Sequence, residues 1–196
     1  MDLLSKRVEL FIDGTYLWHS MMSLESKLDL AKLPHEIIAN LETILPGSFD
    51  LKMTRFFGSI PTNVCSYDEW RIKRRSQFFK TLEEKGYYNH ISKIDFHGRP
   101  FCKKDRNARD PWEPKEKCVD IALATDLIYR GTRDYYDIAV VLTGDRDFTP
   151  ALHNICSQGK DIVIAAFQES CSHELSQEYP TLWLDPLVKN CVFHSS

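Results

Sequence analysis

Three aspartates follow predicted strands in a pattern that would gather them at one edge of a sheet. Asp13 comes directly after the β-rich run over residues 7–12, and Asp145 and Asp147 follow the apolar run over residues 137–142. In an open parallel sheet the carboxyl ends of the strands share one edge, and ligands bind there. If the two runs are neighbouring strands, the three carboxylates converge at that edge.

A fourth aspartate, Asp120, stands in the first turn of a helical segment that is apolar on nearly all sides. A carboxylate there is costly to bury unless it is paired, hydrogen-bonded or bound to a cation. Converging carboxylates can stay ionised together around a divalent cation, and Mg²⁺ and Mn²⁺ prefer oxygen ligands. Such an ion activates water and stabilises charge on a phosphate. Each aspartate alone could serve only a turn or a helix start, but together they indicate metal-assisted hydrolysis of phosphodiesters.

The elements that must position these residues alternate between strands and helices along the chain. Short apolar runs predict strands, and amphipathic segments bounded by Gly or Pro predict helices between them. The alternation predicts a single three-layer α/β domain over residues 1–196, with a mainly parallel central sheet. We expect strands at 7–12, 51–60, 87–96, 137–142, 161–166 and 181–184, and helices at 16–28, 34–45, 67–85, 117–129, 149–158 and 173–178.

Composition excludes several other classes of protein. The 196 residues are 43% hydrophobic and 27% charged, as in ordinary globular domains. No apolar run approaches the roughly 20 residues that span a bilayer, and no secretory signal is visible, so we expect a cytoplasmic protein without membrane contact. The six cysteines form no CxxC pair, although a zinc site from Cys102, Cys118 and His97 stays open. The net charge of −3 argues against binding nucleic acid by bulk attraction.

Several stretches of the sequence, taken in combination, resemble one known family. They are FIDG at 11–14, KCVDIALATD at 117–126, VVLTGDRDFTPAL at 140–152, GKDIVIAAF at 159–167 and a Ser-x-x-Leu element at 172–175. In order and spacing they are similar to the NYN family (LabA-like), part of the PIN-like nuclease superfamily. The resemblance implies a Rossmann-like PIN/NYN domain with an acidic cluster, a divalent metal and RNase activity.

The same resemblance assigns roles to the acidic residues. Asp13, Asp120 and Asp145 match acidic positions that hold the metal, with Mg²⁺ or Mn²⁺ as the expected ion. Asp147 completes the catalytic set or orients the attacking water. Asp126 matches a second acid of the same helix and is left without an assigned role.

Three further residues are expected on the substrate side of the site. Lys117 matches the lysine of the KxVD motif and is expected to contact a phosphate, and Thr143 supplies a hydroxyl that supports the acidic residues. Tyr16 departs from the pattern, because such proteins commonly carry an asparagine there. A tyrosine can stack on a base, but it cannot reproduce the paired donor and acceptor of an amide.

Residues 97–116 are poor in apolar side chains and contain three prolines, so we expect a loop or hairpin insertion there. Basic residues outnumber acidic ones in this insertion and aromatic residues are interleaved, a composition that suits phosphates and unpaired bases. Arg99, Lys103 and Lys104 are therefore expected to bind substrate, beside the acidic site. The basic run over residues 71–75 is interpreted as a solvated helix face.

The sequence therefore predicts a divalent-metal-dependent nuclease that acts on single-stranded or structured RNA. DNA as a further substrate and a homodimer stay open. The alternative is a catalytically weak or inactive RNA-binding or regulatory module of the same fold, which the departure at Tyr16 permits. A third interpretation is another phosphoryl hydrolase built on similar acidic geometry.

Overall fold

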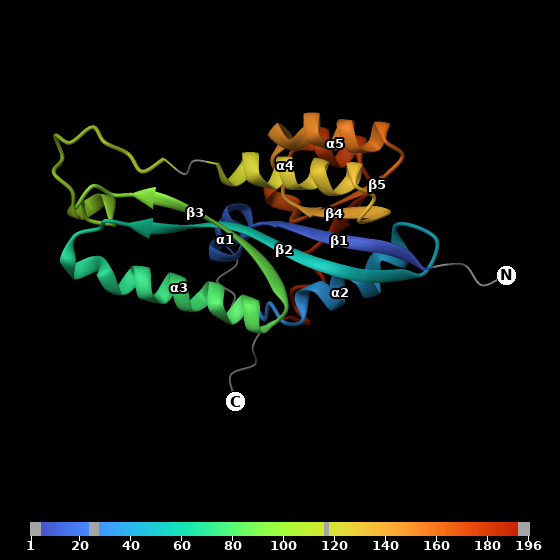
Figure 1. Cartoon of the computed structure of the whole chain (residues 1–196), viewed down its shortest axis with the longest axis horizontal. Coiled ribbons are helices and arrows are strands. Elements are labelled where there is room, and N and C mark those ends of the chain that lie inside the picture. The colour runs from blue at the N-terminus through green and yellow to red at the C-terminus, as the bar shows by residue number, and fades with distance from the viewer. Residues whose placement is uncertain (1–4, 24–27, 116–117, 192–196) are drawn as a thin grey trace.

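Six parallel strands form a sheet between two layers of helices (Figure 1). The computed structural model describes residues 5–23, 28–115 and 118–191. The strands are β1 (Lys6–Asp13), β2 (Phe49–Thr62), β3 (Tyr87–Asp95), β4 (Ile138–Leu142), β5 (Asp161–Ala166) and β6 (Thr181–Trp183). The helices are α1 (Gly14–Ser23), α2 (Leu33–Asn40), α3 (Glu69–Glu84), α4 (Val119–Thr132), α5 (Thr149–Ser157) and α6 (His173–Glu178).

The strand order, β3-β2-β1-β4-β5-β6, places a reversal of chain direction across the sheet beside β1. The chain runs outward from β1 to β3 and then crosses back to β4 on the other side. In doubly wound sheets of this kind ligands bind at the reversal, outside the carboxyl ends of the strands. β4 pairs with β1 as far as the partners Ile12 and Leu142, so the two strands end side by side. The prediction that these two runs are neighbours is therefore confirmed.

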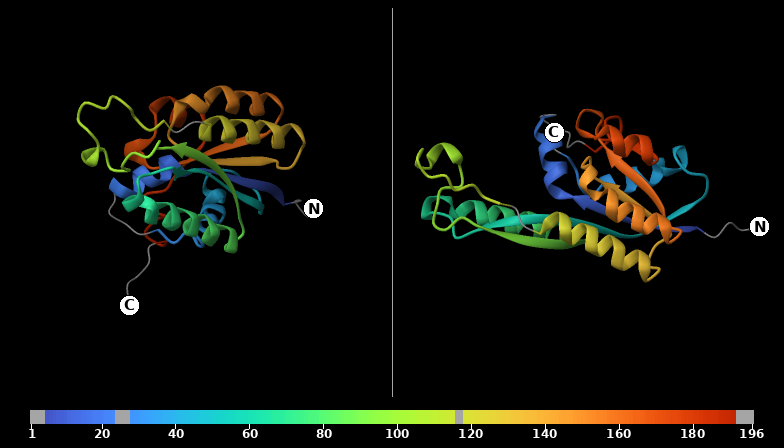
Figure 2. Two further views of the ribbon diagram at one scale, coloured as in Figure 1. Left: turned by 60° about the vertical axis from the view of Figure 1, so that its left-hand side comes forward. Right: turned by 90° about the horizontal axis from the view of Figure 1, so that it is seen from above.

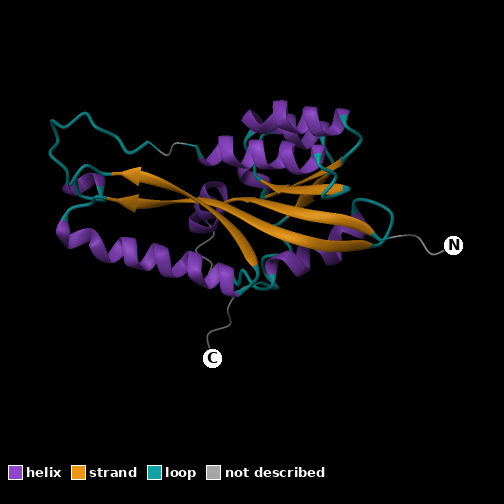
Figure 3. Ribbon diagram, in the orientation of Figure 1, coloured by secondary structure: helices purple, strands orange, loops and turns teal. Residues whose placement is uncertain are grey.

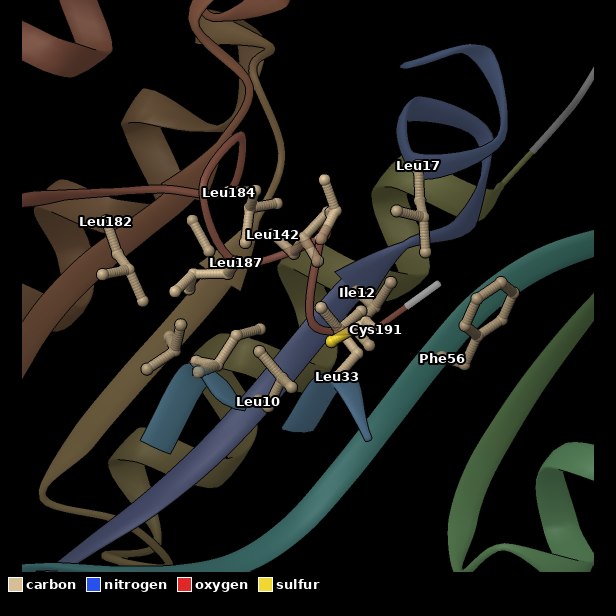
Figure 4. Close-up of a cluster of buried hydrophobic side chains, with 14 of the residues drawn as sticks. Leu10, Ile12, Leu17, Leu33, Phe56, Leu142, Leu182, Leu184, Leu187 and Cys191 are labelled. Atoms are coloured by element: carbon tan, nitrogen blue, oxygen red, sulfur yellow. The ribbon is translucent and has the colours of Figure 1, made fainter. Parts of the chain in front are cut away.

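Alternate residues of the central strands supply two separate hydrophobic layers. On one face, Leu10 and Ile12 of β1 pack with Leu17 of α1 and Leu33 of α2 (Figure 4). On the other face, Phe11 packs with residues of α4, α5 and α6. Figure 3 shows helices on both sides of the strands. Because successive side chains of a strand point to opposite faces, a sheet covered on both sides needs the nearly continuous apolar runs seen in the sequence.

Two arginine–carboxylate pairs fix α4 to the sheet. Glu9 of β1 is 1% exposed and accepts hydrogen bonds of 2.5 Å from both Nε and Nη2 of Arg130. Arg55 of β2 is buried and donates from Nε to Asp126, in the middle of the helix. A pair bonded through two nitrogens fixes geometry as well as contributing energy. The pairs therefore set the position of α4 along the strands.

β2 and β3 extend well beyond the rest of the sheet. Asp13, the last residue of β1, is level with Phe57 of β2, but β2 continues to Thr62, paired with Asp95 of β3. At the usual rise of a strand this projection is roughly 17 Å long. The views in Figures 1 and 2 show this two-stranded projection with α3 along it and the insertion at its end.

The predicted strands and helices are all present, with ends shifted by a few residues. The insertion is a loop: its described residues, through 115, contain one 3₁₀ turn, Lys103–Asp105, and no strand. Predictions that fall on residues 24–27 and 116–117 lie outside the described residues. Within the described part of the chain, every helix is too short or too polar to span a bilayer.

We expect Arg130→Ala to lower the free energy of unfolding by about 3 kcal/mol, because it leaves the Glu9 carboxylate buried without its partner. The matched control is Arg133→Ala, which removes an exposed arginine next to the end of α4 and should change that free energy by less than about 0.5 kcal/mol. Urea denaturation of the two variants and the wild type measures both effects. Equal effects would contradict a role of the Glu9–Arg130 pair in holding α4.

Candidate functional site

Asp13 is the buried centre of the candidate site. It ends β1, is 5% exposed, and lies on the face of the strand that α4 covers. Its Oδ1 accepts hydrogen bonds of 3.0 Å from the N–H groups of Thr15 and Tyr16, in the first turn of α1. Thr143 Oγ1 lies 3.3 Å from Oδ2 and donates to it. The carboxylate therefore satisfies the helix start, which in turn favours its negative charge.

Gly14 permits this tight passage from strand to helix. A Cβ at this position would lie 2.5 Å from the backbone oxygen of Phe57 and 2.5 Å from the ring of Phe56, both on β2. Since real Cβ atoms do not approach backbone that closely, only glycine lets α1 begin directly against β2. Two separate constraints thus explain the Asp-Gly pair of the FIDG stretch. The aspartate caps the start of α1, and the glycine lets α1 pass close to β2.

Thr143 connects Asp13 to the loop after β4. Its side chain is fully buried, and its Oγ1 also accepts a hydrogen bond of 3.2 Å from the N–H of Asp145. The Asp145 carboxylate accepts a hydrogen bond of 2.9 Å from the N–H of Asp147, which caps the 3₁₀ turn Arg146–Phe148. Both aspartates are exposed at the sheet edge. Thr143 therefore holds the acidic residues in place from inside the protein, and a fully buried hydroxyl does not reach a substrate.

Tyr16 attaches α1 to the loop after β5. Its hydroxyl accepts hydrogen bonds of 2.9 Å from the N–H of Phe167 and from Ser170 Oγ, and burial raises its pKa above the usual value. Its ring lies so close to Gly144 that a Cβ there would be 2.7 Å from the ring. Both ends of the side chain are thus used inside the protein. Stacking on a base, which the sequence suggested, finds no support in this half-buried position.

Asp120 brings a second carboxylate toward Asp13 from the start of α4. Burial, with a smaller contribution from the charge of Asp120, raises the pKa of Asp13 to about 6, although hydrogen bonds from three neighbours act to lower it. Asp120 itself is exposed. The structure therefore brings together the aspartates of β1 and α4 and connects Asp145 to them through Thr143.

The basic residues expected beside the acidic site lie elsewhere. Arg99 Nε donates to Asp110 at 2.6 Å, and Lys103 Nζ donates to Glu113 at 2.5 Å, so these two charges are paired within the insertion. Lys104 is exposed in the same 3₁₀ turn as Lys103. This turn lies at the end of the β2–β3 projection, away from the end of β1 (Figures 1 and 2).

The donor set at the sheet edge suits a hard cation, although no complete metal site is assembled. Among the described residues, no three His, Cys, Asp or Glu side chains lie close enough together to hold a metal, and this includes His97, Cys102 and Cys118. Mg²⁺, however, commonly takes one or two carboxylates and completes its ligand set with water and substrate phosphate. The carboxylates of Asp13 and Asp120 have that chemistry. Lys117 lies outside the described residues.

Comparisons with known proteins address the family and the fold. The family model for the NYN domain matches residues 7–182. A protein of unknown function from Vibrio parahaemolyticus has a similar crystal structure, with a TM-score of 0.65, 14% sequence identity, and coverage of 98% of this chain and 99% of that chain. At this identity the likeness shows the fold alone. A search of curated proteins found no match.

Without divalent ions, we expect the contribution of Asp13 to the free energy of unfolding to fall by roughly 2 to 3 kcal/mol as the pH rises from 4 to 7. Native Asp13 keeps its proton up to a pKa of about 6, whereas the unfolded chain releases it near 3.8, so this stabilisation is present below pH 3.8 and lost as the pH passes 6. Asp13→Asn, neutral at every pH, should lack this slope. Urea denaturation in EDTA at several pH values measures it, and parallel slopes for wild type and variant would contradict the assignment.

Proposed function

We propose that this chain, which belongs to the NYN domain family of the PIN-like nuclease superfamily, is a divalent-metal-dependent nuclease that hydrolyses RNA. NYN domains are generally nucleases that act on nucleic acid, and nucleases of this kind generally depend on a divalent metal. The observation that carries the proposal is the approach of the Asp120 charge to the buried Asp13 carboxylate, at the carboxyl end of a central strand. Carboxylates at the chain reversal of such a sheet suit phosphoryl chemistry.

Each acidic residue has a distinct part in the proposed reaction. Asp13 and Asp120 hold the ion, and Asp145 contributes directly or through water. A bound Mg²⁺ or Mn²⁺ supplies positive charge to the phosphate and lowers the pKa of a water molecule. Asp147, exposed on the same loop as Asp145, orients the attacking water. Thr143 keeps the Asp13 carboxylate and the Asp145 backbone at a fixed separation through its two hydrogen bonds.

The substrate side of the proposed site faces solvent, because Asp120, Asp145 and Asp147 are all exposed. We assign the phosphate contact to Lys117, which stands shortly before α4 in the sequence. All six cysteines are free thiols, which is in keeping with action in a reducing compartment such as the cytoplasm.

One observation favours an RNA-binding module without catalysis as a second candidate. Position 16, where related sequences commonly carry an asparagine, holds a tyrosine whose hydroxyl is bonded to the loop after β5. An amide that could orient water or metal is therefore missing beside Asp13. A module of this kind would hold RNA without cutting it.

We expect Asp145→Asn to lower Mn²⁺-dependent cleavage of RNA by at least about 100-fold, because the amide cannot replace a charged ligand. The matched control is Asp161→Asn, a substitution of an exposed aspartate at the start of β5, on the opposite edge of the sheet, which should stay within about twofold of wild type. Cleavage of a labelled single-stranded RNA, with and without EDTA, measures both. Thermal unfolding and RNA affinity should be unchanged in both variants.

Other outcomes of the same assay separate the candidates. If the wild type cleaves no single-stranded RNA, structured RNA or DNA with either ion, the binding module replaces the nuclease. If it cleaves only small phosphate esters, a different phosphoryl hydrolase is indicated. If Asp161→Asn loses as much activity as Asp145→Asn, the acidic edge is not where the reaction takes place.

A further inference from the structure

The end of the β2–β3 projection carries exposed aromatic rings, two of which lie against one arginine. This group, here called the aromatic tip, consists of Tyr67, Trp70, Arg71 and Phe101, whose three rings are 59%, 49% and 39% exposed. The Arg71 guanidinium lies 4.4 Å from the centre of the Trp70 ring and 4.9 Å from that of Phe101. Several large rings exposed together mark a binding surface more often than rings exposed singly. The proposed reaction uses none of these four residues.

A buried carboxylate holds the aromatic tip in one arrangement. Asp68 is 4% exposed and accepts hydrogen bonds of 2.7 Å from Arg71 Nε and from the backbone N–H of Phe101. Burial alone would raise the pKa of Asp68, but these bonds and one from Cys65 outweigh it and keep the pKa below its usual value. The Asp68 carboxylate therefore joins the start of α3 to the insertion. The exposed rings are preorganised, so a ligand that binds them need not order them.

The insertion supplies the support beneath the exposed rings. Phe96 is 3% exposed and stacks on Phe101 at 5.2 Å, with 19° between the ring planes. Trp112 meets Phe96 edge to face at 5.5 Å, and Arg106 lies over the Trp112 ring at 5.1 Å. These contacts pack the insertion against itself. The solvent-facing surfaces of Trp70 and Phe101 take no part in that packing.

We propose that the aromatic tip stacks against the bases of single-stranded RNA whose scissile phosphate lies at the acidic edge. Aromatic rings interleaved with arginine suit unpaired bases, because every base offers a π face and arginine adds charge and stacking. The surroundings carry the complementary charge, with Lys73 and Arg74 exposed on α3 and six basic against three acidic residues over 97–115. The path of the strand from the aromatic tip to the acidic edge rests on the proposed nuclease function. The binding of bases at the aromatic tip does not.

The geometry of the projection sets a minimum length for such a strand. The aromatic tip lies beyond Thr62, roughly 17 Å past the level of Asp13. With stacked nucleotides about 3.4 Å apart, about five nucleotides are needed to cover that distance. A trinucleotide can therefore occupy the aromatic tip or the acidic edge but not both, whereas a 12-nucleotide strand spans the two.

The test compares the affinities of long and short RNA in an Asp145→Asn background, where the substrate stays intact. We expect Trp70→Ala to weaken binding of a fluorescein-labelled 12-nucleotide oligouridylate by about tenfold. We also expect the parent to bind a trinucleotide, which cannot occupy both places, more weakly than the 12-nucleotide strand. Trp70→Phe, which keeps a π face, should stay within about threefold of the parent. The matched control is Tyr129→Ala, which removes an exposed ring from α4 that also has an arginine over it, and should bind both RNAs as the parent does. Fluorescence anisotropy measures the affinity of each of the four proteins for the two RNAs.

The remaining outcomes decide against the proposal. Equal affinity of Trp70→Ala and the parent for the 12-nucleotide RNA, or equal affinity of the parent for the two RNAs, would overturn it. So would failure of the parent to bind the long single strand, or binding of a duplex with the same dependence on Trp70; the first of these would point to a protein partner. Binding is measured without cleavage, so the two proposals can fail separately. If the wild type cleaves no RNA but Trp70→Ala still weakens binding, the nuclease proposal fails and the proposal for the aromatic tip stands.

Discussion

The position of α4 along β1 is the constraint on which the acidic site depends. Glu9 and Asp13 lie on the same face of β1, about 13 Å apart at the rise of a strand. Asp120 and Arg130 are about 15 Å apart along α4. Because the two lengths match, bonding Glu9 to Arg130 at one end brings the start of the helix to the level of Asp13 at the other. Repulsion between the two aspartates would move α4 away, and its two buried ion pairs oppose that movement.

This arrangement concentrates an unfavourable interaction at the edge where chemistry is proposed. A carboxylate held among hydrophobic residues beside a like charge is stabilised poorly, and its raised pKa reports that cost. Groups of this kind are common in sites that bind cations or exchange protons, because the bound cation or proton neutralises a charge that the fold alone leaves poorly stabilised. The buried charges of Glu9 and Arg55, by contrast, are paired with residues of α4. The contrast between the paired Glu9 and Asp126 and the crowded Asp13 is what distinguishes the site from the structural ion pairs around it.

The sequence predicted the strands, the helices and the edge where the aspartates lie, because these depend on local patterns. It missed the contacts between residues that are far apart in the chain. The apolar runs and Gly-Pro boundaries predicted the strands and helices, and placement after strands was enough to bring Asp13 to the edge where Asp145 lies. Nothing in the order of residues showed that Asp126 would pair with Arg55, because that contact crosses the sheet-to-helix interface. A count of charges likewise cannot show that Arg99 is paired within its own loop, which is why the insertion was placed at the site.

The aromatic tip was missed for the same reason, since its rings come from two segments that Asp68 and Arg71 bring together in the fold. Its separation from the acidic edge bears on the net charge of −3, which at first argued against nucleic acid. Phosphates are repelled by the exposed aspartates, so affinity for a strand cannot originate at that edge without a cation. Stacking on rings roughly 17 Å away is nearly independent of that repulsion at physiological salt, where the Debye length is about 8 Å. If the aromatic tip binds the strand and the acidic edge cleaves it, a protein with a net negative charge can retain RNA while its acidic edge stays free for the reaction.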